Sequence, residues 1–137
     1  MSQATPDPWI SVAMDSYSAA IELKNGRHWR SAVSRAYYAV YSKLSGCLRE
    51  LGVAMPAGRE GPSHGSLSDL VESNLTTLRA QDRPRLASRL RELYRLRVLA
   101  DYWPSLNLGE AEAQSALRLM GDVFHWLEEK AHGKSRK

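Results

Sequence analysis

A charged pair, Arg97 and Asp101, interrupts an otherwise apolar helical stripe near the end of the segment from residue 82 to 103. On a helical wheel of about 100° per residue, both fall on the face that carries the leucines of this segment, so the pattern directs them toward the core or a cleft. Residues four apart can pair, which lowers the cost of removing both charges from water. The pair is therefore either a structural ion pair that fixes helix register, which we favour from the pattern alone, or a polar site that binds or reacts.

The segment from residue 28 to 51 carries more aromatic surface than one apolar stripe needs. Tyr37, Tyr38 and Tyr41 extend beyond the stripe together with Ser34, and Arg35 shares a face with Tyr38. The tyrosines either pack against neighbouring helices with their hydroxyls bonded at the edge, or form a dimer contact or a surface where a ring stacks on a base.

Seven arginines and only two acidic residues lie between residues 79 and 97. Arg91 and Arg95 share a face with Tyr102 that is roughly opposite the core, and such a run is most often a solvated face. The planar guanidinium also suits phosphate, so the run is compatible with a weakly specific contact to nucleic acid.

The sequence lacks the histidine and glycine motifs by which common classes of enzyme can be identified. His28, His64 and His125 lie in separate predicted elements without the spacing of a zinc site. The sequence has no Walker loop, dinucleotide fingerprint or GxSxG elbow. We therefore expect no metal and no cofactor.

Five periodic segments predict the helices that position these side chains, and no alternating pattern predicts a strand. The expected fold is all-α, an antiparallel up-and-down bundle of four to five helices. A single domain over residues 1–130 is followed by a polar tail over 131–137. The expected helices run over about 8–24, 28–51, 63 or 66 to 80, 82–103 and from 107 onward, with a glycine- and proline-rich loop over 52–62.

Two details of this pattern can be checked in a structure. The first helix carries Val12 and Ile21 at the helical spacing of its apolar residues. The last helix is expected to open at Asn107, with Glu110 three residues later as in a capping box.

The composition of the sequence indicates which cellular compartment and which partners to expect. The 137 residues carry a formal net charge of +4, which permits an acidic partner or nucleic acid without requiring either. Cys47 is the single cysteine, so no intrachain disulfide can form, as in a reducing compartment. No window approaches the roughly 20 apolar residues of a membrane span, and the first residues do not resemble a signal peptide. We expect a cytoplasmic protein with no membrane partner.

Three segments carry a family resemblance: SRAYYAVY at 34–41, SHGSL at 63–67 and RLRVLADYW at 95–103. With their R-A-Y-Y-A and R-x-x-A-D-Y motifs, they resemble the HEPN domain superfamily, in particular its small stand-alone prokaryotic members. The resemblance covers nearly the whole chain. It implies a helical bundle that forms a homodimer, acts in toxin–antitoxin pairs, defence or RNA processing, and often has a minimal nucleotidyltransferase as its partner.

Nuclease members of that superfamily carry an R-x4-6-H motif near the position of RLRVLADYW. This chain has Arg97 but no histidine in the six positions that follow, and Asp101 stands where one could be, counting from Arg95. Without that imidazole the usual ribonuclease chemistry is not expected, although His64 could supply one from another helix. The candidate catalytic residues are therefore Arg97, Asp101 and His64.

Three functions follow from these patterns. We favour a non-catalytic HEPN-like module that dimerises and binds RNA, a nucleotide or a partner protein. The alternatives are a HEPN ribonuclease toxin with an atypical active site and a purely structural interaction bundle. The predicted ligand- or RNA-binding residues are Arg35, Tyr38, Arg91, Arg95, Arg97 and Tyr102.

Overall fold

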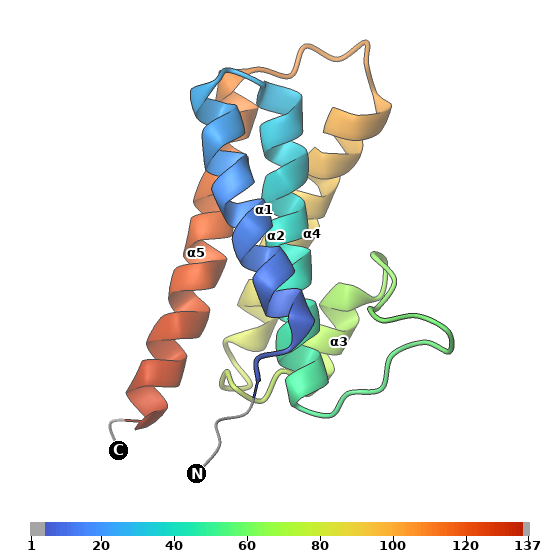
Figure 1. Cartoon of the computed structure of the whole chain (residues 1–137), viewed down its shortest axis with the longest axis vertical. Helices are drawn as coiled ribbons and strands as arrows, with labels where there is room; N and C mark the ends of the chain where they lie inside the picture. Colours follow the sequence, from blue (N-terminus) through green and yellow to red (C-terminus); the bar gives the residue numbers. More distant parts are fainter. Residues whose placement is uncertain (1–4, 136–137) are drawn as a thin grey trace.

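The computed structural model describes the backbone of residues 5–135 and the side chains of residues 5–129. Within this part of the chain the fold is all-α, as predicted. Four long helices run up and down alternately, and a short one lies beside the lower ends of α2 and α4 (Figure 1). The helices are α1 (Pro8–Asn25), α2 (Trp29–Glu50), α3 (Leu67–Asn74), α4 (Arg83–Tyr102) and α5 (Glu110–Ser135).

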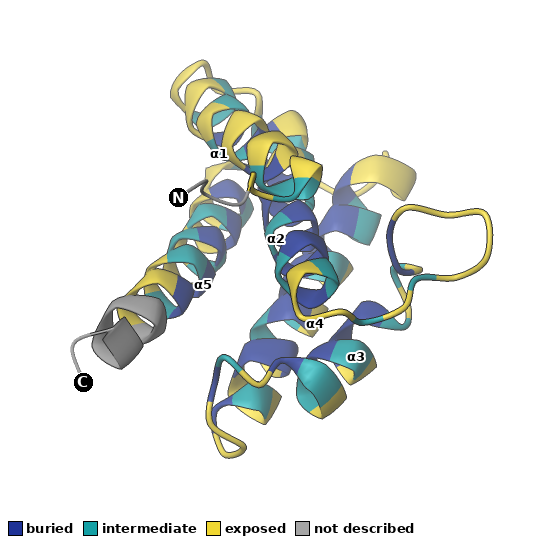
Figure 2. Cartoon of the chain, turned by 60° about the horizontal axis from the view of Figure 1, so that its bottom comes forward, coloured by how far each residue is buried: buried dark blue, intermediate teal, exposed yellow. Residues whose placement is uncertain are grey.

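Helix α2 is the centre of the bundle and packs against the four other helices. It contributes fully buried residues along most of its length, whereas the outward face of α1 and the loop after α2 are exposed (Figure 2). None of the described helices is long and apolar enough to cross a lipid bilayer. The largest fully buried side chains are Tyr37, Leu44, Leu48, Leu67, Leu75, Leu78, Leu86, Leu93 and Met120.

Small residues let α1 and α2 approach closely. Ala13, Ser16 and Ala20 are the buried residues of α1. A Cβ atom on Gly46 of α2 would lie 2.6 Å from Cδ1 of Ile10 and 3.3 Å from Cβ of Trp9. The face of α1 that packs on α2 therefore consists of small residues, and Gly46 leaves room on α2 for Ile10 and Trp9.

The sequence pattern assigned Val12 and Ile21 to the apolar positions of the first helix, and this part of the prediction was wrong. Val12 is 45% exposed and Ile21 is 39% exposed. Both lie roughly 80–100° away from the stripe of small residues that faces α2, on either side of it.

The third helix is shorter than predicted and ends at Asn74 rather than Ala80. The Asn74 amide donates to the carbonyl oxygen of Leu70, at 3.2 Å, and Leu75 leaves helical geometry with ψ 72°. Leu75 and Leu78 are nevertheless buried, so turns rather than a helix deliver these two leucines to the core.

Helix α5 begins at Glu110, three residues later than predicted. The reciprocal contact of a capping box is made two residues further along, because the backbone N–H of Gly109 donates to Oε1 of Glu112 at 2.8 Å. The helix continues to Ser135, into the segment predicted as a polar tail, whose side chains lie outside the described residues.

Candidate functional site

The side chain of Arg97 extends from α4 toward α2, and the residue is only 8% exposed. Its Nε donates to Oδ2 of Asp101 at 2.9 Å, and its Nη2 donates to the hydroxyl oxygen of Tyr38, also at 2.9 Å. Ser34 donates to the same carboxylate oxygen of Asp101 at 3.2 Å. The predicted pair therefore forms, and side chains of α2 hold both of its members.

Aromatic rings surround the Arg97 guanidinium. Its Cζ lies 5.8 Å from the ring centroid of Tyr37, 5.3 Å from that of Tyr38 and 5.3 Å from that of Tyr102. Tyr37 is fully buried, whereas Tyr102 is 64% exposed. The guanidinium thus sits at the boundary between core and solvent, and cation–π contacts help to hold it there.

One nitrogen of the Arg97 guanidinium, Nη1, makes no hydrogen bond within the described part of the chain. Burial alone lowers the pKa of this guanidinium, but Tyr38, Asp101 and Tyr102 together raise it, so the group stays charged. Arg97 offers a fixed positive charge with a free edge.

Arg35 extends this cluster to the surface. It is exposed, and its Cζ lies 5.0 Å from the ring centroid of Tyr38. The structure thus brings four of the predicted binding residues together, namely Arg35, Tyr38, Arg97 and Tyr102, and adds Asp101 and Ser34. We refer to these six residues as the Arg97 cluster.

His64 joins the edge of the cluster from the loop that precedes α3. Its Nδ1 lies 2.6 Å from the hydroxyl oxygen of Tyr37. The imidazole centroid lies 4.6 Å from the ring of Tyr41, and the ring of Tyr94 stacks at 6.2 Å with an interplanar angle of 13°. Burial, and then the charge of Arg97, lower the pKa of His64.

The loop before α3 is fixed where it carries His64. The Tyr41 hydroxyl donates to the carbonyl oxygen of Pro62 at 2.6 Å, and Nε1 of Trp9 donates to that of Glu60 at 2.9 Å. A Cβ atom on Gly61 would lie 2.8 Å from the Tyr41 hydroxyl oxygen, so a residue without a side chain is needed here. The glycine- and proline-rich loop is therefore a positioning element for the imidazole.

The tyrosines of α2 pack within the chain. Tyr37 is fully buried and Tyr41 is 7% exposed, each against the imidazole of His64. Tyr37 and Tyr41 thus pack inside the bundle, as the packing interpretation expected, whereas Tyr38 is only partly buried.

Arg30 was not identified from sequence and acts on the far end of α4. Its Nη1 donates to the carbonyl oxygens of Leu99, at 3.3 Å, and Ala100, at 2.9 Å. Its Nη2 donates to those of Pro104 and Leu106. One side chain thus binds carbonyl oxygens at the end of α4 and in the segment that follows it, next to Asp101 and Tyr102. No local pattern signals this, because the contacts span about 70 residues of sequence.

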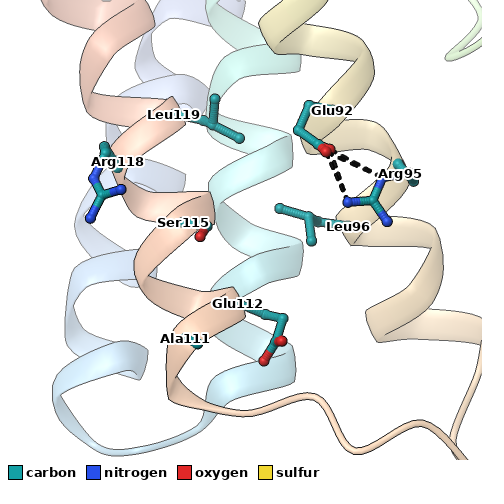
Figure 3. A pocket seen from close by; sticks show the side chains of 8 residues that line it. All are labelled: Glu92, Arg95, Leu96, Ala111, Glu112, Ser115, Arg118 and Leu119. Carbon is teal, nitrogen blue, oxygen red and sulfur yellow. Dashed lines mark hydrogen bonds and ion pairs between the residues drawn. The ribbon is translucent and has the colours of Figure 1, made fainter.

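Two predicted binding residues lie elsewhere. Arg91 pairs with Glu72, at 2.9 Å, and Arg95 pairs with Glu92 through both carboxylate oxygens. Arg95 lines an open groove of ≈ 420 Å³ between α4 and α5, into which Leu96 and Leu119 project (Figure 3). Neither arginine joins the Arg97 cluster.

The described residues contain no group of three or more His, Cys, Asp or Glu side chains that could hold a metal ion. The chemistry available to the Arg97 cluster is therefore that of a guanidinium, tyrosine hydroxyls, a carboxylate and a nearby imidazole. Such a set can bind an anion and exchange protons.

Comparison with known proteins gives a match at the level of the family. No curated protein and no solved structure matches the chain. The family model of the HEPN domain matches residues 7–130, which span all of α1 to α4 and most of α5. This chain belongs to the HEPN domain family.

Proposed function

We propose that this HEPN chain is a non-catalytic binding module and that its ligand places a phosphate group, from RNA or a nucleotide, on Arg97. One observation carries the proposal: the guanidinium is held by Asp101, Tyr38 and three aromatic rings, yet its Nη1 donates to no described residue. A pre-positioned guanidinium with a free edge suits phosphate oxygens, since little side-chain entropy remains to be lost on binding.

Neighbouring side chains support a nucleic-acid ligand. Tyr102 is 64% exposed beside the guanidinium, and Arg35 is exposed on the ring of Tyr38. An exposed ring next to a phosphate-binding arginine offers a stacking surface for a base. The carboxylate of Asp101 opposes an incoming phosphate, so we expect modest affinity.

Fluorescence anisotropy with a labelled single-stranded RNA tests this proposal. Arg97→Gln should weaken binding about tenfold or more, because a charge-assisted hydrogen bond contributes roughly 1.5–3 kcal/mol. Arg95→Gln is the matched control, since Arg95 lies on the same helix but is paired with Glu92 at the α4–α5 groove. Both variants must show the helical spectrum and melting behaviour of a folded bundle.

The expected binding weakens steeply with salt, because phosphate contacts release counterions. Equal loss in Arg97→Gln and Arg95→Gln would indicate a diffuse basic surface and contradict an assigned site. Absence of salt-sensitive binding would leave the interaction-bundle alternative.

A second candidate function, a ribonuclease, is supported by the position of His64. Arg97 and His64 flank the same two rings, Tyr37 and Tyr38, so an imidazole is near the guanidinium despite the missing motif histidine. If the chain is a non-catalytic binding module, RNA incubated with the wild-type protein in EDTA should remain intact. Cleavage that disappears in both Arg97→Ala and His64→Ala would establish the second candidate instead.

We also propose, on the family alone, a cytoplasmic homodimer that acts with a minimal nucleotidyltransferase in a toxin–antitoxin pair. Light scattering at micromolar concentration should give twice the mass of the chain. Expression alone and with the genomic neighbour, scored for growth arrest, tests the pairing. A monomer, or growth independent of the neighbour, would contradict the respective part.

A further inference from the structure

The contact between Tyr37 and His64 constrains where the imidazole carries its proton. Tyr37 is fully buried, with 0% of its surface exposed to solvent, and its hydroxyl oxygen lies 2.6 Å from Nδ1 of His64. Burial raises the pKa of this phenol far above its ordinary value, with a smaller effect from Tyr41, so the hydroxyl keeps its proton.

That buried O–H has one acceptor among the described residues, which is Nδ1. If Nδ1 carried the imidazole proton, it would donate to the tyrosine oxygen and leave the hydroxyl hydrogen buried without an acceptor. An unmade buried hydrogen bond is costly, so the arrangement in which Tyr37 donates to Nδ1 is favoured. A neutral His64 must then carry its proton on Nε2.

The other nitrogen is available. His64 is partly exposed, and Nε2 has no hydrogen-bond partner among the described residues. The imidazole centroid lies 5.4 Å from the ring of Tyr37 and 5.7 Å from that of Tyr38. Cζ of Arg97 lies 5.8 Å and 5.3 Å from the same two rings.

We propose that His64 is a second ligand-binding residue of the Arg97 cluster, a neutral imidazole whose Nε2–H donates to a phosphate oxygen, and that Tyr37 is the positioning residue that fixes this tautomer. The proposal rests on the proposed function for its ligand, but the tautomer stands on the geometry of the free protein.

The surroundings favour the neutral form. The imidazole is faced by Tyr37, Tyr38 and Tyr41 of α2 and by Tyr94 and Arg97 of α4. No carboxylate within the described part of the chain is in contact with it. Burial and Arg97 lower the pKa of His64, in the same direction. Near neutral pH the residue therefore donates without bringing a charge.

Nitrogen NMR of the free, full-length protein tests the tautomer. In the wild type near neutral pH, His64 should show a protonated Nε2 and an unprotonated Nδ1. Tyr37→Phe removes the donor while keeping the ring, so the tautomer preference should weaken and the titration midpoint of His64 should rise. Tyr94→Phe is the matched control: Tyr94 stacks on the same imidazole but does not bond its Nδ1, and the phenylalanine keeps the ring, so the pattern should stay unchanged.

Affinity for the labelled single-stranded RNA tests the ligand contact. His64→Ala should weaken binding about tenfold, the effect of losing one hydrogen bond to a charged group. His64→Gln should restore most of the affinity, because its amide nitrogen can occupy the place of Nε2–H.

The outcomes separate the two proposals. A protonated Nδ1 in the wild type, or equal effects of Tyr37→Phe and Tyr94→Phe, would overturn the tautomer assignment. Loss of binding in Arg97→Gln together with unchanged binding in His64→Ala would overturn the contact while leaving the proposed function intact. No binding by the wild type would overturn both the function and the contact, whatever the NMR shows.

Discussion

The two members of the Arg97–Asp101 pair differ in how far they are buried. The arginine side chain is 10% exposed and that of the aspartate is 28% exposed. A fully buried pair broken by removing one partner costs roughly 3–5 kcal/mol, and a surface pair contributes at most about 1 kcal/mol. The burial of this pair lies between these limits, so we expect an intermediate contribution to stability. The pair lies at the boundary between core and solvent, where the Arg97 cluster can also contact a ligand.

Asp101→Ala should therefore destabilise the protein by about 1–2 kcal/mol, because Arg97 keeps Tyr38 and access to water on one side. Urea denaturation measures this, with Glu92→Ala as the control, since Glu92 holds an exposed arginine and its loss should cost about 0.5 kcal/mol or less. A loss above about 3 kcal/mol would identify a purely structural core pair.

His64 gives the stability of the fold a dependence on pH. Its pKa is lowered from 6.5 in the folded protein, by burial and then by Arg97. The unfolded chain therefore binds the proton more tightly, so this contribution to stability is complete above pH 6.5 and is lost as the pH falls through the lowered folded value. His64→Gln should show a smaller loss of stability between pH 7.5 and 5 than the wild type. An identical loss in both proteins would exclude His64 as its source.

At the scale of elements, the contact between α1 and α2 depends on a glycine. Gly46→Ala gains helix propensity of about 1 kcal/mol but forces a methyl group against Ile10 and Trp9, so we expect a net loss of about 1 kcal/mol. Gly121→Ala in α5 meets nothing within 4 Å and should stabilise by about 0.5–1 kcal/mol. Thermal melts of the two variants should shift in opposite directions. A stabilised Gly46→Ala would show that α1 can move away from α2.

The sequence predicted the elements where caps and periodicity agree. Asp7 caps α1, where its carboxylate accepts from the backbone N–H of Trp9 at 3.0 Å, and Pro8 and Pro84 stand in the first turns of α1 and α4. The end of α3 could not be predicted, because Leu75 and Leu78 keep helical spacing while turns carry them to the core.

At the scale of the whole molecule, the site was predictable only in part. The inward positions of Arg97 and Asp101 follow from the wheel, and Arg35 does meet Tyr38. The roles of Tyr37 and Arg30 could not be predicted, because each acts through a contact 27 or more residues away in sequence. A helical wheel also cannot show that Arg91 and Arg95 are paired with glutamates.

If Arg97 binds a phosphate, Asp101 competes with that ligand inside the protein, since its carboxylate accepts from Nε of Arg97. Asp101→Asn removes that charge while keeping the shape, which should strengthen the binding of RNA. A gain of affinity is the most informative result, because a damaged fold cannot produce it. Glu92→Gln is the control, since it frees Arg95 on the opposite face of α4.

The most direct measurement is therefore the dissociation constant of the labelled single-stranded RNA for wild type, Asp101→Asn and Glu92→Gln at the same salt concentration. We predict that Asp101→Asn binds roughly three- to tenfold tighter than wild type, the effect of removing one opposing charge at a partly exposed site. Glu92→Gln should change the affinity far less. Unchanged or weaker binding by Asp101→Asn, or an equal gain in both variants, would contradict a phosphate site at Arg97.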